Sequence, residues 1–219
     1  MPGQLKLLSE GFPFTPVNLP KNDIYRLIEA RLPSYARATT LIEAYFGNLA
    51  WFTCIVEREQ IMGELMPTIY KNRRFGSPPA NNPPHRFSDS STLEDDESFD
   101  GEYGARLPLL LAVFALGAAG DLTQPFGNEE GDLYHHMSRA ALALRPVFRG
   151  ASMETVQAVM MSATYPFCAG RAVSLEPAWK MMSLGLILAC SVCVLFHKSY
   201  LPYLNIVASR LGYVCIPTS

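Results

Sequence analysis

The sequence predicts an all-α protein, a bundle of about six to eight helices with a long disordered linker. Apolar residues recur at helical spacing in four consecutive stretches between Arg106 and Val192, with short polar breaks between them. No alternating strand pattern competes over these stretches. Of the 219 residues, 49% are apolar and only 17% are charged, so the chain can build a sizeable core.

Composition divides the chain into five segments. Residues 1–20 hold four prolines without a helical period and predict an extended arm. Residues 21–70 carry the first helices, residues 105–195 the core helices, and residues 196–219 a divergent tail. Between the two helical segments, residues 71–104 are rich in proline and end in an acidic run. Their apolar side chains are too sparse to be buried, so we expect this linker to be disordered.

Local signals place the helix ends in residues 21–70. Asn22 is a candidate cap for a short helix that ends at Arg31. Ser34 predicts the start of a longer helix, because its hydroxyl can accept a free backbone N–H of the first turn. A further helix is expected over residues 57–70, although Pro67 lacks a backbone donor and favours a kink there.

Four helices are expected in the core segment. Pro108 suits the first turn of the first helix, where its missing N–H costs nothing. A second helix begins near Glu129, Ser152 caps the third, and Pro177 starts the last. Trp179 heads the predicted buried seam of that last helix and is expected to pack on the first. The seam comprises Trp179, Met182, Leu186, Ala189, Cys190 and Cys193.

The charge and the cysteine content limit which classes of function the sequence allows. The 18 basic residues are scattered and outnumbered by 20 acidic ones, which argues against a nucleic-acid footprint in this chain. The five cysteines form an odd set, and the sequence opens without a secretory signal pattern. Free thiols in a reducing, intracellular compartment are therefore expected.

An uncharged run near the end of the core segment raises the question of a membrane. Residues 181–196 carry no charge, but a spanning helix needs about 20 residues. A buried core helix is the better interpretation. The alternative, a small membrane-associated helical protein that uses residues 181–196, stays open.

Two clusters could carry metal chemistry. Cys190 and Cys193 have the spacing of a metal knuckle, but zinc needs two further ligands, so we expect buried structural cysteines. His135 and His136 point about 100° apart on a helix. Asp132 and His136 share a face, where an exposed ion pair is expected and a metal is the alternative. We predict no metal ligands, no bound cofactor and no catalytic residues, and hence no enzyme.

The methionine pairs offer one further alternative. Residues 160–161 and 181–182 are Met-Met pairs, most simply flexible fillers of the core. They could instead line an apolar ligand pocket.

Four stretches resemble, in order, the fungal-specific transcription factor domain, the middle homology or xylanolytic-activator-type regulatory region of zinc binuclear cluster regulators. The Glu154-Thr155-Val156-Gln157 element and the order of the stretches make the resemblance specific. The stretches are LIEAYFGNLAWF (41–52), LLLAVFALGAAGDL (109–122), AALAL with SMETVQA (140–144 and 152–158) and AWKMMSLGLILA (178–189).

The resemblance implies a nuclear, all-α regulatory domain that controls transcription through protein partners, self-association or a small-molecule effector, without catalysis. The six-cysteine zinc module that binds DNA in this family is absent from the sequence, so DNA contact is expected only through a separate module. The resemblance stops at Val192, and the chain is expected to be a truncated or mis-spliced copy that lacks the family's C-terminal half.

Overall fold

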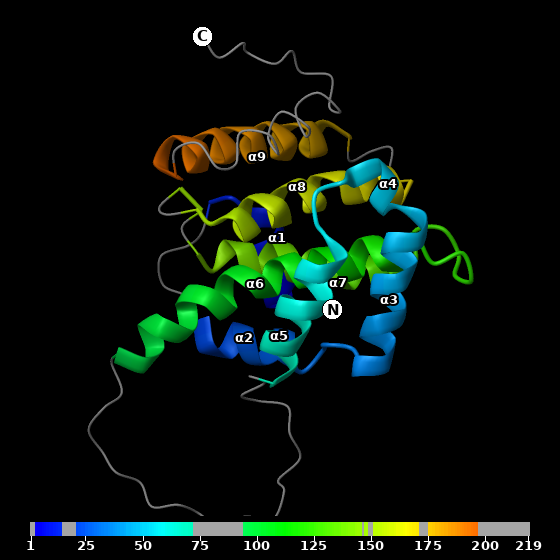
Figure 1. The fold of residues 1–219 in the computed structure, drawn as a ribbon, viewed down its shortest axis with the longest axis horizontal. Helices are drawn as coiled ribbons and strands as arrows, with labels where there is room; N and C mark the ends of the chain where they lie inside the picture. Colours follow the sequence, from blue (N-terminus) through cyan, green and yellow to red (C-terminus); the bar gives the residue numbers. More distant parts are fainter. Residues whose placement is uncertain are drawn as a thin grey trace, which may run out of the picture.

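The computed structural model describes residues 3–14, 21–71, 94–145, 147–148, 151–170 and 175–196. Within these residues the protein is all-α, which confirms the predicted fold class. Figure 1 shows how the helices are arranged. They are α1 (Gly3–Gly11), α2 (Lys21–Glu29), α3 (Tyr35–Asn48), α4 (Ala50–Thr53), the π-helix η1 (Gln60–Leu65), α5 (Met66–Lys71), α6 (Glu94–Ala119), α7 (Glu129–Ala143), α8 (Met153–Cys168) and α9 (Leu175–Phe196).

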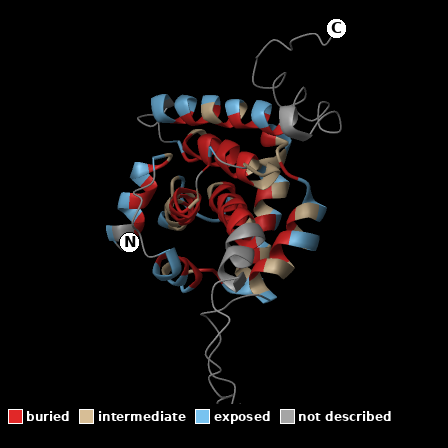
Figure 2. Cartoon of the chain, turned by 90° about the vertical axis from the view of Figure 1, so that its left-hand side faces the viewer, coloured by how far each residue is buried: buried red, intermediate tan, exposed pale blue. Residues whose placement is uncertain are grey.

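Helix α6 occupies the centre of the bundle. Helices α3, α7 and α8 pack against it, and α9 packs against α8, as the topmost layer in Figure 1. Leu107, Phe114 and Leu116 of α6 have no exposed surface, and Figure 2 shows the buried residues gathered in the middle of the bundle. A helix that is apolar on nearly every side is stable only when other helices cover it all round, as they do here.

The N-terminal segment forms a helix where an extended arm was expected. Helix α1 packs along α7 and buries Leu5 and Leu8, and Phe12, directly after the helix, is also buried. These residues follow helical spacing, but the surrounding prolines obscured that period. Residues 15–20 lie outside the described part of the chain. The prediction of an extended arm is therefore wrong for residues 3–11.

Helix α6 begins at Glu94, inside the segment that was expected to be disordered. Residues 72–93 lie outside the described residues. From Tyr103 on, the side chains make tertiary contacts that fix the helix. The Tyr103 hydroxyl donates to Oε1 of Glu29 at 2.6 Å, and Nη1 of Arg106 donates to the Thr68 hydroxyl at 2.9 Å. Composition alone cannot reveal such contacts, which explains why the boundary at residue 104 was wrong.

Pro108 consequently lies inside α6 rather than in its first turn. An interior proline removes one helical hydrogen bond and destabilises a helix by about 3 kcal/mol. Burial of the residues on both sides offsets this loss, because Leu107 and Leu109 have no exposed surface. The Ser138 hydroxyl of α7 donates to the Pro108 carbonyl oxygen at 2.8 Å, which joins the two helices at this point.

The kink favoured by Pro67 takes the form of a π-helical turn. The Met66 N–H bonds to the carbonyl of Ile61, one residue further back than in an α-helix. Widening the turn before a proline relieves the clash between its ring and the preceding turn. The expected helix over residues 57–70 is therefore η1 followed directly by α5.

Helix α9 buries Met182 and Ala189 of the predicted seam, but not Trp179 or Cys190. Trp179 is 50% exposed and packs on Phe167 of α8, and Cys190 is exposed. The side chain of Cys193 lies outside the described part. The buried positions are Ala178, Met181, Met182, Gly185, Leu188, Ala189 and Val192.

Helix α9 packs closely on α8 at Gly185. A Cβ atom there would lie 2.4 Å from Sδ of Met160, so a larger residue would require the Met160 side chain to shift. Among the described helices, none combines the length and the apolar character that crossing a membrane requires. The predicted tail from residue 197 onward lies outside the described residues.

Two predicted caps are confirmed. The hydroxyls of Ser34 and Ser152 accept the backbone N–H groups three residues later, each at 3.3 Å. Asn22 is not a cap, because α2 already begins at Lys21. Helix α7 begins at Glu129 as predicted, with Asn128 as its cap.

Candidate functional site

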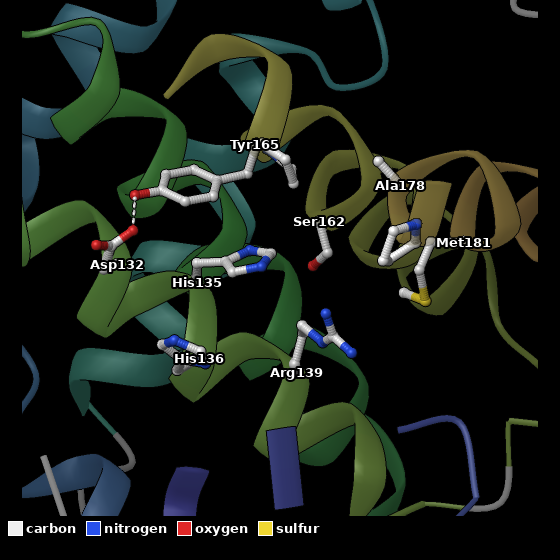
Figure 3. A pocket seen from close by; sticks show the side chains of 10 residues that line it. Asp132, His135, His136, Arg139, Ser162, Tyr165, Ala178 and Met181 are labelled. Atoms are coloured by element: carbon white, nitrogen blue, oxygen red, sulfur yellow. Dashed lines mark hydrogen bonds between the residues drawn. The ribbon is translucent and has the colours of Figure 1, made fainter. Parts of the chain in front are cut away.

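A pocket of about 330 Å³ opens between α7, α8 and α9. Helices α7 and α9 both pack against α8, and the pocket lies where they flank it (Figure 3). Helix α7 contributes the polar wall, from positions 132, 135, 136 and 139. Residues at this spacing share one face of a helix, so α7 presents a continuous polar stripe to the pocket.

One end of the pocket is fixed by contacts between α7 and α8. The Tyr165 hydroxyl donates to Oδ1 of Asp132 at 3.0 Å (Figure 3). The His135 ring stacks on the Tyr165 ring, with centroids 4.5 Å apart and planes 17° apart. These two contacts hold His135 in one orientation beneath Tyr165.

His135 is a neutral side chain at neutral pH. It is only 8% exposed, and its Nδ1 atom is buried without a hydrogen-bond partner. Burial lowers the pKa of His135 well below 6.5, and the charges of Arg139 and His136 lower it further. A neutral imidazole keeps one donor and one acceptor, so His135 can hydrogen-bond a ligand without adding charge.

His136 links the pocket wall to helix α1. Its Nδ1 lies 2.8 Å from the Ser9 hydroxyl oxygen. Burial and the charge of Arg139 lower its pKa below 6.5, while Asp132 and Glu10 act in the opposite direction. The expected exposed ion pair between Asp132 and His136 is therefore wrong, because Ser9 and Tyr165 are the hydrogen-bond partners of these side chains.

Arg139 is the unmatched charge of the pocket. Its Nε atom is buried without a partner, and no hydrogen bond or ion pair joins its side chain to any part of the chain that the structure describes. Burial lowers the pKa of Arg139, and the nearby charge of Glu10 raises it. An arginine nevertheless stays protonated in proteins. In Figure 3 its guanidinium extends from α7 towards Met181 of α9.

The cysteines lie outside this pocket. Burial raises the pKa of the Cys168 thiol to about 11, so it is not a thiolate at neutral pH. Cys190 is exposed, which contradicts the expected buried cysteine. Within the described residues, no three His, Cys, Asp or Glu side chains gather to hold a metal ion.

Sequence reasoning identified part of this site. It singled out Asp132, His135, His136 and the 181–182 methionine pair, of which Met181 lines the pocket. It missed Arg139 and Tyr165. The available signal in the sequence was the helical spacing of the polar residues at positions 132, 135, 136 and 139. The missing partner of Arg139 is a tertiary feature that no local pattern reveals.

No protein-family model, curated protein or solved structure matches this chain at a significant level.

Proposed function

We propose that this chain is the regulatory, middle homology domain of a fungal transcription factor. It acts in the nucleus and controls transcription through protein partners and a small-molecule effector. DNA contact belongs to a separate zinc module. The four stretches that carry the resemblance fall in α3 with α4, α6, α7 with α8, and α9. These helices pack consecutively, which supports treating the four stretches as one domain.

The observation that carries the proposal is the pocket with the unpaired guanidinium of Arg139. It lies between helices that belong to the last two stretches of the resemblance. A pocket with a few convergent polar groups is the usual form of a small-molecule site. An effector bound there contacts both α7 and α9, and therefore changes how firmly α9 is held on the bundle.

The exposed side chains of α9 provide the surface for partner binding in the proposed mechanism. Trp179 and Ile187 of α9 are 50% and 62% exposed, although the Trp179 ring also meets Phe167 of α8 edge to face. Exposed aromatic and aliphatic side chains on one helix suit a protein partner or a second copy of the chain. Effector binding beneath α9 is thereby coupled to partner binding on its outer face.

A regulatory role also fits the chemistry of the pocket better than catalysis does. The Ser162 hydroxyl lies 3.3 Å from that of Ser138, so its neighbour is another hydroxyl rather than a base that would activate it. The nearby histidine, His135, is held by stacking on Tyr165. These groups are arranged to bind rather than to react.

A reporter assay tests the proposal. The chain is fused to an unrelated DNA-binding module, and transcription from a matching promoter is measured in yeast. We expect the fusion to change transcription relative to the module alone, and we expect Trp179→Ser with Ile187→Ser to remove the change. Output equal to that of the bare module would refute the proposal.

Cell fractionation provides an independent check. The proposal predicts that the tagged chain is recovered in the nuclear extract. Recovery in a carbonate-resistant membrane pellet would favour the membrane-associated alternative instead.

A further inference from the structure

The unpaired cation in the pocket indicates the charge of the ligand. A charged group that is partly removed from water is stabilised chiefly by an opposite charge or by hydrogen bonds. Arg139 makes no hydrogen bond or ion pair within the described residues, although its Nε is buried; the charge of Glu10 acts on it without forming an ion pair. The pocket beside it provides room for an anion. A carboxylate fits a guanidinium best, because the two planar groups can form paired hydrogen bonds.

The wall opposite α7 indicates an apolar ligand body. Met181 and Ala178 of α9 line this side, together with Pro166 and Pro177. None of these side chains offers a hydrogen-bond donor. Methionine adapts to aliphatic groups of different shape. A ligand held by Arg139 therefore lies with an aliphatic portion against α9.

The other end of the polar stripe limits how many negative charges the ligand can carry. Asp132 precedes Arg139 by seven residues, which separates them by about 10 Å along the helix. Its carboxylate already accepts the Tyr165 hydroxyl. A second carboxylate on the ligand would approach Asp132 and be repelled. The pocket thus favours one negative charge at the Arg139 end.

We propose that the pocket between α7, α8 and α9 binds a small aliphatic monocarboxylate, with its carboxylate on Arg139 and its chain against Met181 and Ala178. His135 contributes a hydrogen bond from the side. The inference rests on the proposed function in taking this ligand as the effector of the regulatory domain.

Methyl NMR of the purified chain tests binding directly. With ¹³C-methyl methionine, the Met181 signal is assigned through Met181→Leu. Sodium hexanoate is added up to about 10 mM at constant ionic strength, a range suited to a ligand of so few atoms. We expect a saturable shift of the Met181 signal, with little change at the fully buried Met66. Adipate, with a second carboxylate, and hexanol, without charge, should bind at least about 10-fold more weakly.

Two substitutions of Arg139 distinguish the effect of its charge on ligand binding from an effect on folding. Arg139→Gln should weaken hexanoate binding by about 10-fold or more, and Arg139→Lys should retain part of it because the positive charge remains. Arg58→Gln serves as the control, since Arg58 pairs with Glu43 on the surface and does not line the pocket. The methionine spectrum without ligand shows whether each variant is folded.

Each outcome decides the inference. A Met181 shift that depends on the charge at position 139 supports it. The inference is overturned by no saturable shift, by shifts confined to other methionines, or by equal binding of hexanoate and adipate. If hexanoate binds but the reporter fusion does not respond, the ligand class stands and the proposed function fails. If the reporter responds but hexanoate does not bind, the proposed function stands and the ligand class fails.

Discussion

The Tyr103 hydroxyl donates a 2.6 Å hydrogen bond to Oε1 of Glu29, a side chain with no exposed surface. This contact joins the end of α2 to the early turns of α6. It is one of the tertiary contacts that α6 makes just before its apolar run, which begins at Leu107. The rings of Tyr103 and Tyr25 also meet edge to face, with centroids 6.4 Å apart.

Removal of this hydroxyl is expected to destabilise the protein. Tyr103→Phe takes away a donor from a buried carboxylate and should lower the free energy of unfolding by about 1–3 kcal/mol. Urea unfolding monitored by circular dichroism measures the change. Tyr35→Phe is the matched control, because the Tyr35 ring is 56% exposed. Equal midpoints for both variants would contradict the role given to Tyr103.

Two glycines should respond in opposite ways to the same substitution. A Cβ at Gly117 would lie 2.1 Å from the carbonyl oxygen of Leu41, so Gly117→Ala must push α6 away from α3. We expect a loss of about 3 kcal/mol or more. Gly47 in α3 has open space around it, and Gly47→Ala should raise helix stability by up to about 1 kcal/mol. Thermal unfolding of both variants gives the comparison, and a tolerated Gly117→Ala would disprove the close approach.

Trp179 contributes less to stability than the sequence suggested. For a buried residue, Trp179→Ala would destabilise by roughly 3–5 kcal/mol. Because the ring is half exposed and meets Phe167 edge to face at 6.2 Å, we expect about 1–2 kcal/mol instead. Phe114→Ala, at a position with no exposed surface, should reach the full range. Chemical denaturation that ranks Trp179→Ala above Phe114→Ala would be evidence against this assignment of the α9 faces.

Asp121 makes stability depend on pH in the acid range. The Thr123 hydroxyl, at 2.6 Å, holds the pKa of Asp121 below its ordinary value of 3.8, with help from Arg37. A lowered pKa contributes stability that is fully present above 3.8 and is lost as the pH falls towards the folded-state value. Thr123→Val should therefore raise the pKa of Asp121 and move the acid unfolding midpoint to higher pH. Carboxyl NMR titration measures the pKa, and an unchanged value would rule out Thr123 as the main cause.

Local signals were sufficient wherever one side chain determines a helix end. The caps at Ser34 and Ser152 follow from hydrogen bonds within a single turn, which the sequence displays directly. The four apolar stretches likewise predicted the core helices, because helical spacing is a property of each stretch. The buried face of α9 was predicted only in part: Met182 and Ala189 are buried, but Trp179 is not, since apolar residues occur on nearly every side of this helix. The packing of α9 on α8, which includes the approach of Gly185 to Met160, is a tertiary feature that spacing along the chain does not reveal.

The candidate site could likewise be predicted only in part from local sequence signals. The polar stripe from Asp132 to Arg139 is visible in the sequence as a helical repeat. Whether each side chain of the stripe is bonded or unpaired depends on the residues of the neighbouring helices. Tyr165 and Ser9 come from other helices to bond Asp132 and His136, whereas no described residue pairs with Arg139. Only the assembled bundle distinguishes the bonded side chains from the unpaired one.

The most direct test of the account measures transcription from the reporter fusion with wild-type chain, Arg139→Gln and Arg58→Gln side by side. If the pocket regulates the domain, Arg139→Gln should change the reporter response by roughly 5-fold or more, the lower range of allosteric coupling, while Arg58→Gln leaves it unchanged. An identical response from all three fusions, at equal protein levels, would contradict the claim that this chain is a regulatory domain controlled through the pocket between α7, α8 and α9.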